Sequence, residues 1–197
     1  MDHKLFGIWD ANVAVLDLGL KPYINVNPVM IPKSAGRNRS RFHKSLDTNI
    51  VERLMNKLRV AGHRGKKHRM SSGHNTSKSI LLYNIIIKVL KIVEQETKKN
   101  PVEVLVRAIE NAAPREEITS IEYGGAKYPQ AVETAPQRRI DMALRQMTQG
   151  AYSKSFNTKK DIIRCLAEEI IKAYNSDQTS QAIAKKLELE RQASSSR

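Results

Sequence analysis

A Gly-Gly pair between two strand-like runs constrains the fold more than any other feature of this sequence. Residues 117–123 and 126–133 flank Gly124-Gly125, and such a two-residue turn favours a β-hairpin because both turn positions need positive φ. The turn sets three cross-strand pairs: Tyr123 with Ala126, Glu122 with Lys127, and Ile121 with Tyr128. Pro129 has no amide hydrogen, so we expect a two-stranded ribbon with a free edge. An isolated ribbon is only marginally stable, so it must pack against helices or against a partner.

Helical patterns lie on both sides of this ribbon. Before it, Asn100 and Pro101 begin a helix that Pro114 ends. After it, a helix is predicted to start at residues 134–136 and to stop at Gly150. Four more helices are predicted: residues 49–62 with a capping box at 49–52, residues 78–98, a helix with a capping box at 158–161, and a peripheral helix at 180–192.

The last predicted helix has only Ile183 and Leu187 on a consistent face, and residues 193–197 are expected to fray. At the other end, three prolines prevent a continuous helix over residues 1–46, and residues 13–18 are a candidate short strand. We therefore predict a mainly α fold: about six helices in a bundle, a protruding β-ribbon at 117–133, and an extended basic N-terminal arm. The arm spans residues 1–46 and the helical domain residues 47–197.

Positive charge is concentrated in one part of the chain. Residues 33–78 contain 13 Lys and Arg against two acids, a net of +11 within a total of +14. A field this concentrated favours a polyanionic partner, because Lys and Arg neutralise phosphates and release condensed counterions. The alternative for residues 33–44 is a solvated tail with no partner.

Catalytic and metal-binding readings find little support. The single cysteine, Cys165, excludes an intramolecular disulfide and a Cys-based zinc site, and His63, His68 and His74 have no metal-ligand spacing relative to it. The run "GHRGKK" lacks the spacing of a phosphate-binding loop. Residues 80–87 form an apolar run far shorter than the ~20 residues that span a bilayer. We expect no enzyme activity, metal, cofactor, small-molecule substrate or membrane partner.

Nucleic acid is the partner class that the charge favours. Aromatic residues make up 5% of the chain and no RRM-type motif is present, so stacking on single-stranded bases is not the expected main mode. A basic, DNA-binding or chromatin-like helical protein is the runner-up, although no helix-turn-helix or dimerisation zipper is recognisable. An enzyme acting on RNA ranks third.

Three motifs in order and spacing carry a family resemblance: "NPVEVLVRAIENAAPREE", "YGGAKYPQAVE" and "PQRRIDMALRQMTQGA". They resemble the small-subunit ribosomal protein S-seven family, over about residues 4–197 and most densely over residues 50–58 and 100–151. The runs "KLFGIW", "PKSAGR" and "ELERQASSSR" resemble its archaeal and eukaryotic branch. The resemblance implies a structural protein that binds 16S-type rRNA, nucleates assembly of the head of the small subunit, and lies at the subunit interface near the decoding centre.

The resemblance also suggests partners and contact residues. Neighbouring head proteins, exit-site tRNA and mRNA are the implied partners, and the small ribosomal subunit in the cytoplasm is the implied location. Predicted rRNA-binding residues are Lys33, Arg37, Arg39, Arg41, Lys44, Arg64, Lys66, Lys67, Arg69, Lys78, Arg115, Arg138, Arg139 and Arg145. The ribbon residues predicted to lie near tRNA and the mRNA exit path are Tyr123, Gly124, Gly125, Lys127 and Tyr128.

Overall fold

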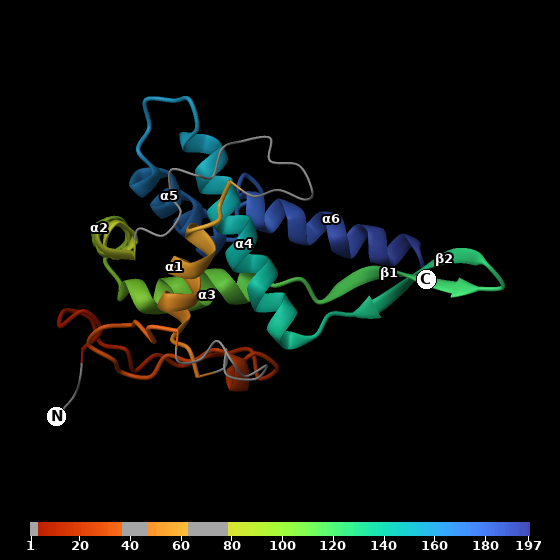
Figure 1. Cartoon of the computed structure of the whole chain (residues 1–197), viewed down its shortest axis with the longest axis horizontal. Helices are drawn as coiled ribbons and strands as arrows, with labels where there is room; N and C mark the ends of the chain where they lie inside the picture. Colours follow the sequence, from red (N-terminus) through yellow and green to blue (C-terminus); the bar gives the residue numbers. More distant parts are fainter. Residues whose placement is uncertain (1–3, 37–46, 63–78) are drawn as a thin grey trace.

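A computed structural model describes residues 4–36, 47–62 and 79–197, and in these it shows a helical body with one protruding ribbon (Figure 1). The helices are η1 (Lys21–Tyr23), a short 3-10 helix, and α1 (Ile50–Leu58), α2 (Ser79–Thr97), α3 (Pro101–Ala112), α4 (Pro136–Ser155), α5 (Ile162–Tyr174) and α6 (Gln181–Ser195). The strands are β1 (Glu116–Tyr123) and β2 (Ala126–Glu133), which pair antiparallel. The predicted mainly α class with a two-stranded ribbon is confirmed.

The ribbon has the predicted register. Tyr123 pairs with Ala126, Glu122 with Lys127 and Ile121 with Tyr128. Gly124 and Gly125 have φ of 59° and 79°, the left-handed values that a tight turn of this kind requires and that glycine adopts without strain. Among the described residues β2 pairs with β1 alone, so Pro129 costs this two-stranded sheet no hydrogen bond on its outer side.

Two predicted helix caps are present in the structure, whereas neither of the two predicted capping boxes is complete. Asn49 and Asn100 accept hydrogen bonds from the amides two residues later, at 2.9 and 3.0 Å. The predicted box at 49–52 is wrong in its second half, because Glu52 accepts hydrogen bonds from Ser34 instead. The box at 158–161 is also wrong. Thr158 donates back to the carbonyl of Lys154 and closes α4, so Asp161 caps α5.

The predicted end of α4 at Gly150 is wrong, because the helix continues to Ser155. A Cβ atom on Gly150 would lie 3.0 Å from Cβ of Gln181 and 3.3 Å from Cδ of Glu169. Glycine is therefore needed here for the close approach of α5 and α6, and it acts within the helix rather than as a stop signal.

The core is built around α5, which packs against α2, α3 and α4. As predicted, α2 contacts more than one helix, since it touches α1, α3 and α5. Each of the helices α1 to α5 contributes fully buried aliphatic side chains, among them Leu54, Ile86, Leu105, Leu144 and Leu166. Spacings of three and four along each helix place these residues on one face, which is why the bundle assembles.

The C-terminal helix supports the ribbon. In Figure 1, α6 runs alongside the base of β1 and β2, and it packs against both strands and α4. Of the two residues predicted to share a face, Ile183 is buried but Leu187 is 43% exposed, whereas Ala193, predicted to fray, is fully buried. Small alanines instead let α6 approach its neighbours closely.

Residues 4–36 follow an extended path along the side of the body near α3 (Figure 1). The candidate strand at 13–18 is wrong, because no strand is present among these residues and the two amides of Leu16 and Asp17 donate to the Glu110 carboxylate. The segment is nevertheless packed. Leu5, Leu20 and Ile24 are buried, and the indole of Trp9 donates to Glu94 at 2.9 Å.

Candidate nucleic-acid interface

The predicted rRNA-binding residues divide into two groups. Nine of them lie outside the residues that the structure describes: Arg37, Arg39, Arg41, Lys44, Arg64, Lys66, Lys67, Arg69 and Lys78. The remaining five, Lys33, Arg115, Arg138, Arg139 and Arg145, are described. Their surroundings decide which of them have charge available for an external partner.

A cleft of about 650 Å³ lies between the N-terminal segment, α1 and α4. Residues 33–36 and Thr48, which flank segment 37–46, both line it, and so does Ser79, which follows segment 63–78. Those two segments contain nine Lys and Arg and no acid. The body thus brings residues on both sides of segment 37–46 and the residue after segment 63–78 to a single cleft.

The cleft itself adds further positive charge. Lys33, Arg53, Lys57 and Arg59 line it against two acids, Glu52 and Asp141. The Arg53 guanidinium, itself buried, lies 3.0 Å from the Asp141 carboxylate, and Nζ of Lys57 lies 3.5 Å from the same oxygen. Asp141 is therefore shared between two cations.

Glu52 is occupied internally as well. Its carboxylate accepts the Ser34 amide at 2.9 Å and the Ser34 hydroxyl at 2.6 Å, which fixes the N-terminal segment to α1. Each acid of the cleft is thus bound to groups of the protein. Four cations thus line the cleft against two acids, so the cleft has a net positive charge, with Lys33 exposed and Lys57 sharing Asp141 with Arg53.

An apolar recess of about 170 Å³ adjoins the cleft. Ile31, Pro32, Met55, Ile80 and Tyr83 contribute to its walls, and Lys33 and Arg59 line both spaces. Cationic groups beside an apolar recess are suited to a phosphate with an adjacent ribose or base, because one site meets both kinds of surface.

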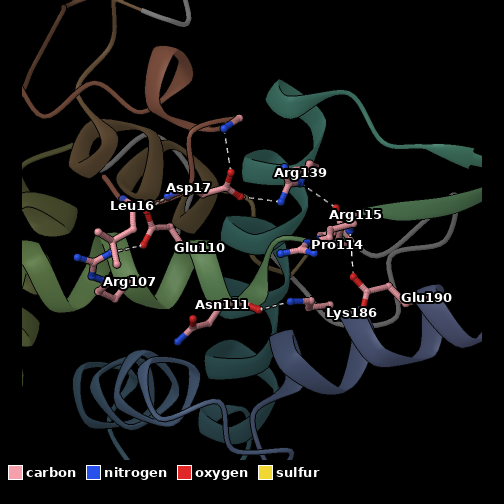
Figure 2. Close-up of polar contacts among 11 residues, drawn as sticks. Leu16, Asp17, Arg107, Glu110, Asn111, Pro114, Arg115, Arg139, Lys186 and Glu190 are labelled. Atoms are coloured by element: carbon pink, nitrogen blue, oxygen red, sulfur yellow. Dashed lines mark hydrogen bonds and ion pairs between the residues drawn. The ribbon is translucent and has the colours of Figure 1, made fainter. Parts of the chain in front are cut away.

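The arginines of α4 lie in three different environments. Arg138 is exposed and lies 2.8 Å from Glu117 of the ribbon. Arg139 is mostly buried, pairs with Asp17 at 2.9 Å, and donates to the Pro114 carbonyl at 3.1 Å (Figure 2). Arg145 is exposed and has no ion pair within the described part of the chain. Arg145 therefore has the most charge available for a partner.

A polar network surrounds the base of the ribbon (Figure 2). The Arg115 amide donates to Glu190 and the Lys186 ammonium donates to the Asn111 carbonyl, so α6 is tied to the segment between α3 and β1. Burial lowers the pKa of Lys186, and the charges of Arg115 and Arg139 lower it further, against the opposing effect of Glu190. The Arg115 side chain itself is exposed.

The ribbon tip presents an exposed aromatic and aliphatic face. Tyr123 is 81% exposed and Tyr128 58%, and the register places both on the same face as Ile121. On the other face Glu122 lies opposite Lys127, so the tip has little net charge.

Comparison with known proteins identifies the family. The model of the family described as ribosomal protein S7p/S5e matches residues 21–197. This chain belongs to that family. Among relatives, the small ribosomal subunit protein uS7 of Nanoarchaeum equitans is 50% identical, with all of both chains covered. The protein of the same description from Archaeoglobus fulgidus is 44% identical over 98% of this chain and 94% of the relative. That of Methanococcus maripaludis is 45% identical over the whole of both.

Membership of this family agrees with the resemblance of the sequence motifs. The described residues contain no cluster of three side chains suited to a metal ion, and no helix among them is long and apolar enough to cross a membrane. The histidines of the weak metal hypothesis, His63, His68 and His74, fall outside the described residues, and Cys165 is buried in α5.

Sequence reasoning did not single out the cleft residues of α1. Arg53 and Lys57 are four residues apart, so they lie on the same side of a helix and could have been grouped by spacing. What spacing does not reveal is that Asp141, 88 residues beyond Arg53, faces them from α4.

Proposed function

We propose that this chain is a structural, non-catalytic protein of the small ribosomal subunit that binds 16S-type rRNA directly. Family membership supports the setting. The observation that supports the mode of binding is the cleft to which two acid-free basic segments lead, since four cations line it against two acids and leave it with a net positive charge.

Electrostatics supplies the strength of this binding. Each phosphate that a Lys or Arg neutralises releases condensed counterions, so affinity falls steeply with salt concentration. Structured RNA is recognised largely through backbone shape and hydroxyl groups. The apolar recess beside Lys33 adds a surface for a ribose or an unstacked base. Arg115, Arg138 and Arg145 are the other described contacts in the proposal, with Arg139 holding the fold together behind them.

We further propose a role in nucleating the head of the small subunit, at the subunit interface near the decoding centre in the cytoplasmic ribosome. The ribbon would reach towards exit-site tRNA and the mRNA exit path, and the remaining surface towards other head proteins. The ribbon's projection from the body and the exposure of Tyr123 and Tyr128 support an external partner at the tip (Figure 1).

Charge removal at the cleft tests the proposal. The variant K33A/K57A should bind small-subunit rRNA roughly tenfold more weakly and lower the salt slope by about 1 to 2, as expected for one or two lost phosphate contacts. The matched control is K159A/K160A, which removes two exposed cations from the link between α4 and α5. Equal affinity and slope for both variants would remove the cleft from the interface.

The basic segment 63–78, which lies outside the described residues, is tested separately. Changing Arg64, Lys66, Lys67 and Arg69 to Ala should weaken rRNA binding and flatten its salt slope while the melting temperature stays the same. Duplex DNA as competitor distinguishes the alternative of a DNA-binding protein. Displacement by DNA at the same concentration as by rRNA would favour that alternative over the ribosomal role.

A further inference from the structure

The apolar recess that adjoins the cleft lies where three elements meet. Residues 31–33 of the N-terminal segment, α1 with the residue that follows it, and the start of α2 line this recess. Its volume of about 170 Å³ corresponds to roughly six water molecules. One planar ring system fits into that space, whereas a whole nucleotide or a helix does not. The cleft of about 650 Å³ beside it leaves room for whatever is attached to the ring.

The apolar lining of the recess has a buried floor and an exposed rim. Leu82 and Met55 are 1% and 7% exposed, whereas Ile31 and Ile80 are 53% and 77% exposed. Two aliphatic side chains from different elements therefore stay in water at the mouth of an apolar space. A flat group that covers them removes apolar surface from water, which is favourable.

The walls of the recess are already ordered. The Lys33 amide donates to the Ile31 carbonyl at 2.8 Å, so residues 31–33 form a tight turn. On α2, the ring of Tyr83 lies edge-on to that of Phe6, with 4.9 Å between the ring centroids. An incoming group would therefore lose little free energy in ordering the side chains that receive it.

Polar groups beside the apolar walls have hydrogen-bonding capacity to spare. Asn56 is exposed, and its side-chain amide, which has both donors and an acceptor, makes no hydrogen bond among the described residues. Nη2 of Arg59 donates to the Ser79 hydroxyl at 2.8 Å, but Nε of Arg59 is buried without an acceptor. The edge of a nucleobase offers donors and acceptors to groups of this kind.

Charge favours a nucleotide here over an aliphatic side chain of another protein. Lys33 and Arg59 line both the recess and the cleft. Glu52 is the acid among the residues that line the recess, and both of its oxygens accept from the Ser34 amide. A base in the recess is joined to a phosphate that can lie against the two cations, whereas an aliphatic side chain would bring them no anion.

We propose that this recess binds one unstacked nucleobase of the small-subunit rRNA. The ring lies over Ile31 and Ile80, its edge meets Asn56, and the attached phosphate faces Lys33 and Arg59. This inference rests on the proposed rRNA binding and adds to it a contact with a base. Because burial of apolar surface releases no counterions, the base contact strengthens binding without steepening the salt dependence.

Photo-crosslinking in assembled small subunits identifies the nucleotide. The full chain with p-benzoylphenylalanine in place of Asn84, an exposed residue one turn after Ile80, should crosslink to one rRNA nucleotide, in a product that ribonuclease degrades. The same probe in place of Leu187, an exposed leucine of α6, should not give that product. A product with protein, or no product at position 84, would overturn the proposal.

An abasic nucleotide tests the contact itself. In an rRNA fragment that binds the full chain, removal of the base at the crosslinked position should weaken binding about tenfold, since a base stacked on protein contributes roughly 1 to 3 kcal/mol. The same removal at an adjacent nucleotide is the control and should change affinity less than twofold. Equal effects at the two positions would contradict insertion of a single base.

The variant I31A/I80A tests the protein side, and both side chains are exposed enough for the fold to tolerate the change. It should bind the intact fragment about five- to tenfold more weakly with the same salt slope, and it should bind the abasic fragment as wild type does. L16A/L18A, which removes two exposed leucines elsewhere, should match wild type on both fragments.

The outcomes separate this inference from the proposed function. Wild-type affinity of I31A/I80A for the intact fragment, or an equal loss on both fragments, would overturn the base contact. If K33A/K57A then still weakens binding and lowers the salt slope, rRNA binding at the cleft stands without the base. If wild type binds neither fragment, the ribosomal function fails as well.

Discussion

Asp17 and Arg139 are 122 residues apart in the sequence, yet Oδ2 of the aspartate lies 2.9 Å from Nη2 of the arginine (Figure 2). This ion pair joins the N-terminal segment to α4 beside the base of the ribbon. The side chains are 28% and 12% exposed, so the pair is only partly screened by water.

D17N should therefore destabilise the protein by about 1 kcal/mol, because the charge of Arg139 loses its partner while its bond to the Pro114 carbonyl remains. Urea unfolding measures the loss, and a double-mutant cycle with R139Q isolates the pair. D10N is the control, since the Asp10 carboxylate accepts, among the described residues, only from the nearby Asn12 amide. A coupling energy near zero in the cycle would show that the pair adds nothing to stability.

A second prediction concerns Glu169, which is fully buried where α4, α5 and α6 meet. Its carboxylate accepts from Lys154 at 2.6 Å, from the Ser180 hydroxyl at 2.8 Å and from the Ala182 amide at 3.3 Å. E169A should cost about 3 kcal/mol of unfolding free energy, since it leaves the start of α6 without its acceptor.

The neighbouring Glu168 is the matched control for that change. Its contact with Arg164 is a long ion pair at 3.5 Å in which the arginine is exposed, so E168A should change stability by less than about 0.5 kcal/mol. Similar losses from the two variants would contradict the role given to Glu169.

Gly150 gives a third prediction, because replacing this helical glycine with alanine should destabilise the protein, whereas the same change usually stabilises a helix. In an exposed helix, glycine to alanine is stabilising by roughly 1 kcal/mol. The added Cβ would meet Gln181 at 3.0 Å and Glu169 at 3.3 Å, so G150A should destabilise by about 1 kcal/mol. Q181G removes the facing Cβ and should recover part of the loss in a double mutant. A more stable G150A would show that α6 moves aside freely.

Local signals in the sequence predicted the parts of the fold that depend on a few adjacent residues. The Gly124-Gly125 turn fixes the register of the ribbon because a two-residue loop leaves only one alignment. Asn49 and Asn100 mark helix starts because each caps amides two residues away.

The rest depends on which elements meet, and no local pattern contains that information. Arg138 and Arg139 are adjacent, yet one is exposed and the other is largely buried against Asp17. Glycine often ends a helix, so Gly150 was expected to end α4. In the structure, the close approach of Gln181 is the reason that this position needs glycine. The candidate cleft was missed for the same reason, since Arg53 and Asp141 are brought together only by the packing of α1 on α4.

The fourth prediction is a pH dependence in the link between α5 and α6. The pKa of Asp177 lies below its ordinary value, first because the Thr179 amide donates to the carboxylate and then because the Thr179 hydroxyl does. A lowered pKa in the folded state means that Asp177 stabilises the fold above the pKa of the unfolded chain. That contribution is lost as the pH falls through the folded pKa.

NMR titration of the Asp177 carboxyl carbon measures this shift. T179A should raise the pKa only part of the way to its ordinary value, because the backbone amide of residue 179 still donates. Near neutral pH, D177N should have a lower free energy of unfolding than wild type. This difference should disappear as the pH falls below the pKa of Asp177 in the folded state. A pKa of Asp177 that is unchanged between wild type and T179A would assign no effect to the hydroxyl.

The last prediction separates the ribbon tip from the body. Deleting residues 123–128 removes the exposed Tyr123 and Tyr128 but leaves the base of the ribbon, where Arg115 and Glu117 are tied to α6 and α4. Because the cleft lies between α1, α4 and the N-terminal segment, the deletion should leave rRNA affinity within about twofold and subunit assembly intact. It should change tRNA or mRNA handling, measured as reading-frame errors and tRNA release in reconstituted subunits. The variant Y123S/Y128S keeps the turn and should reproduce the translation defect if the aromatic face is the contact surface. Failure of assembly in either variant would place the ribbon among the rRNA-binding elements.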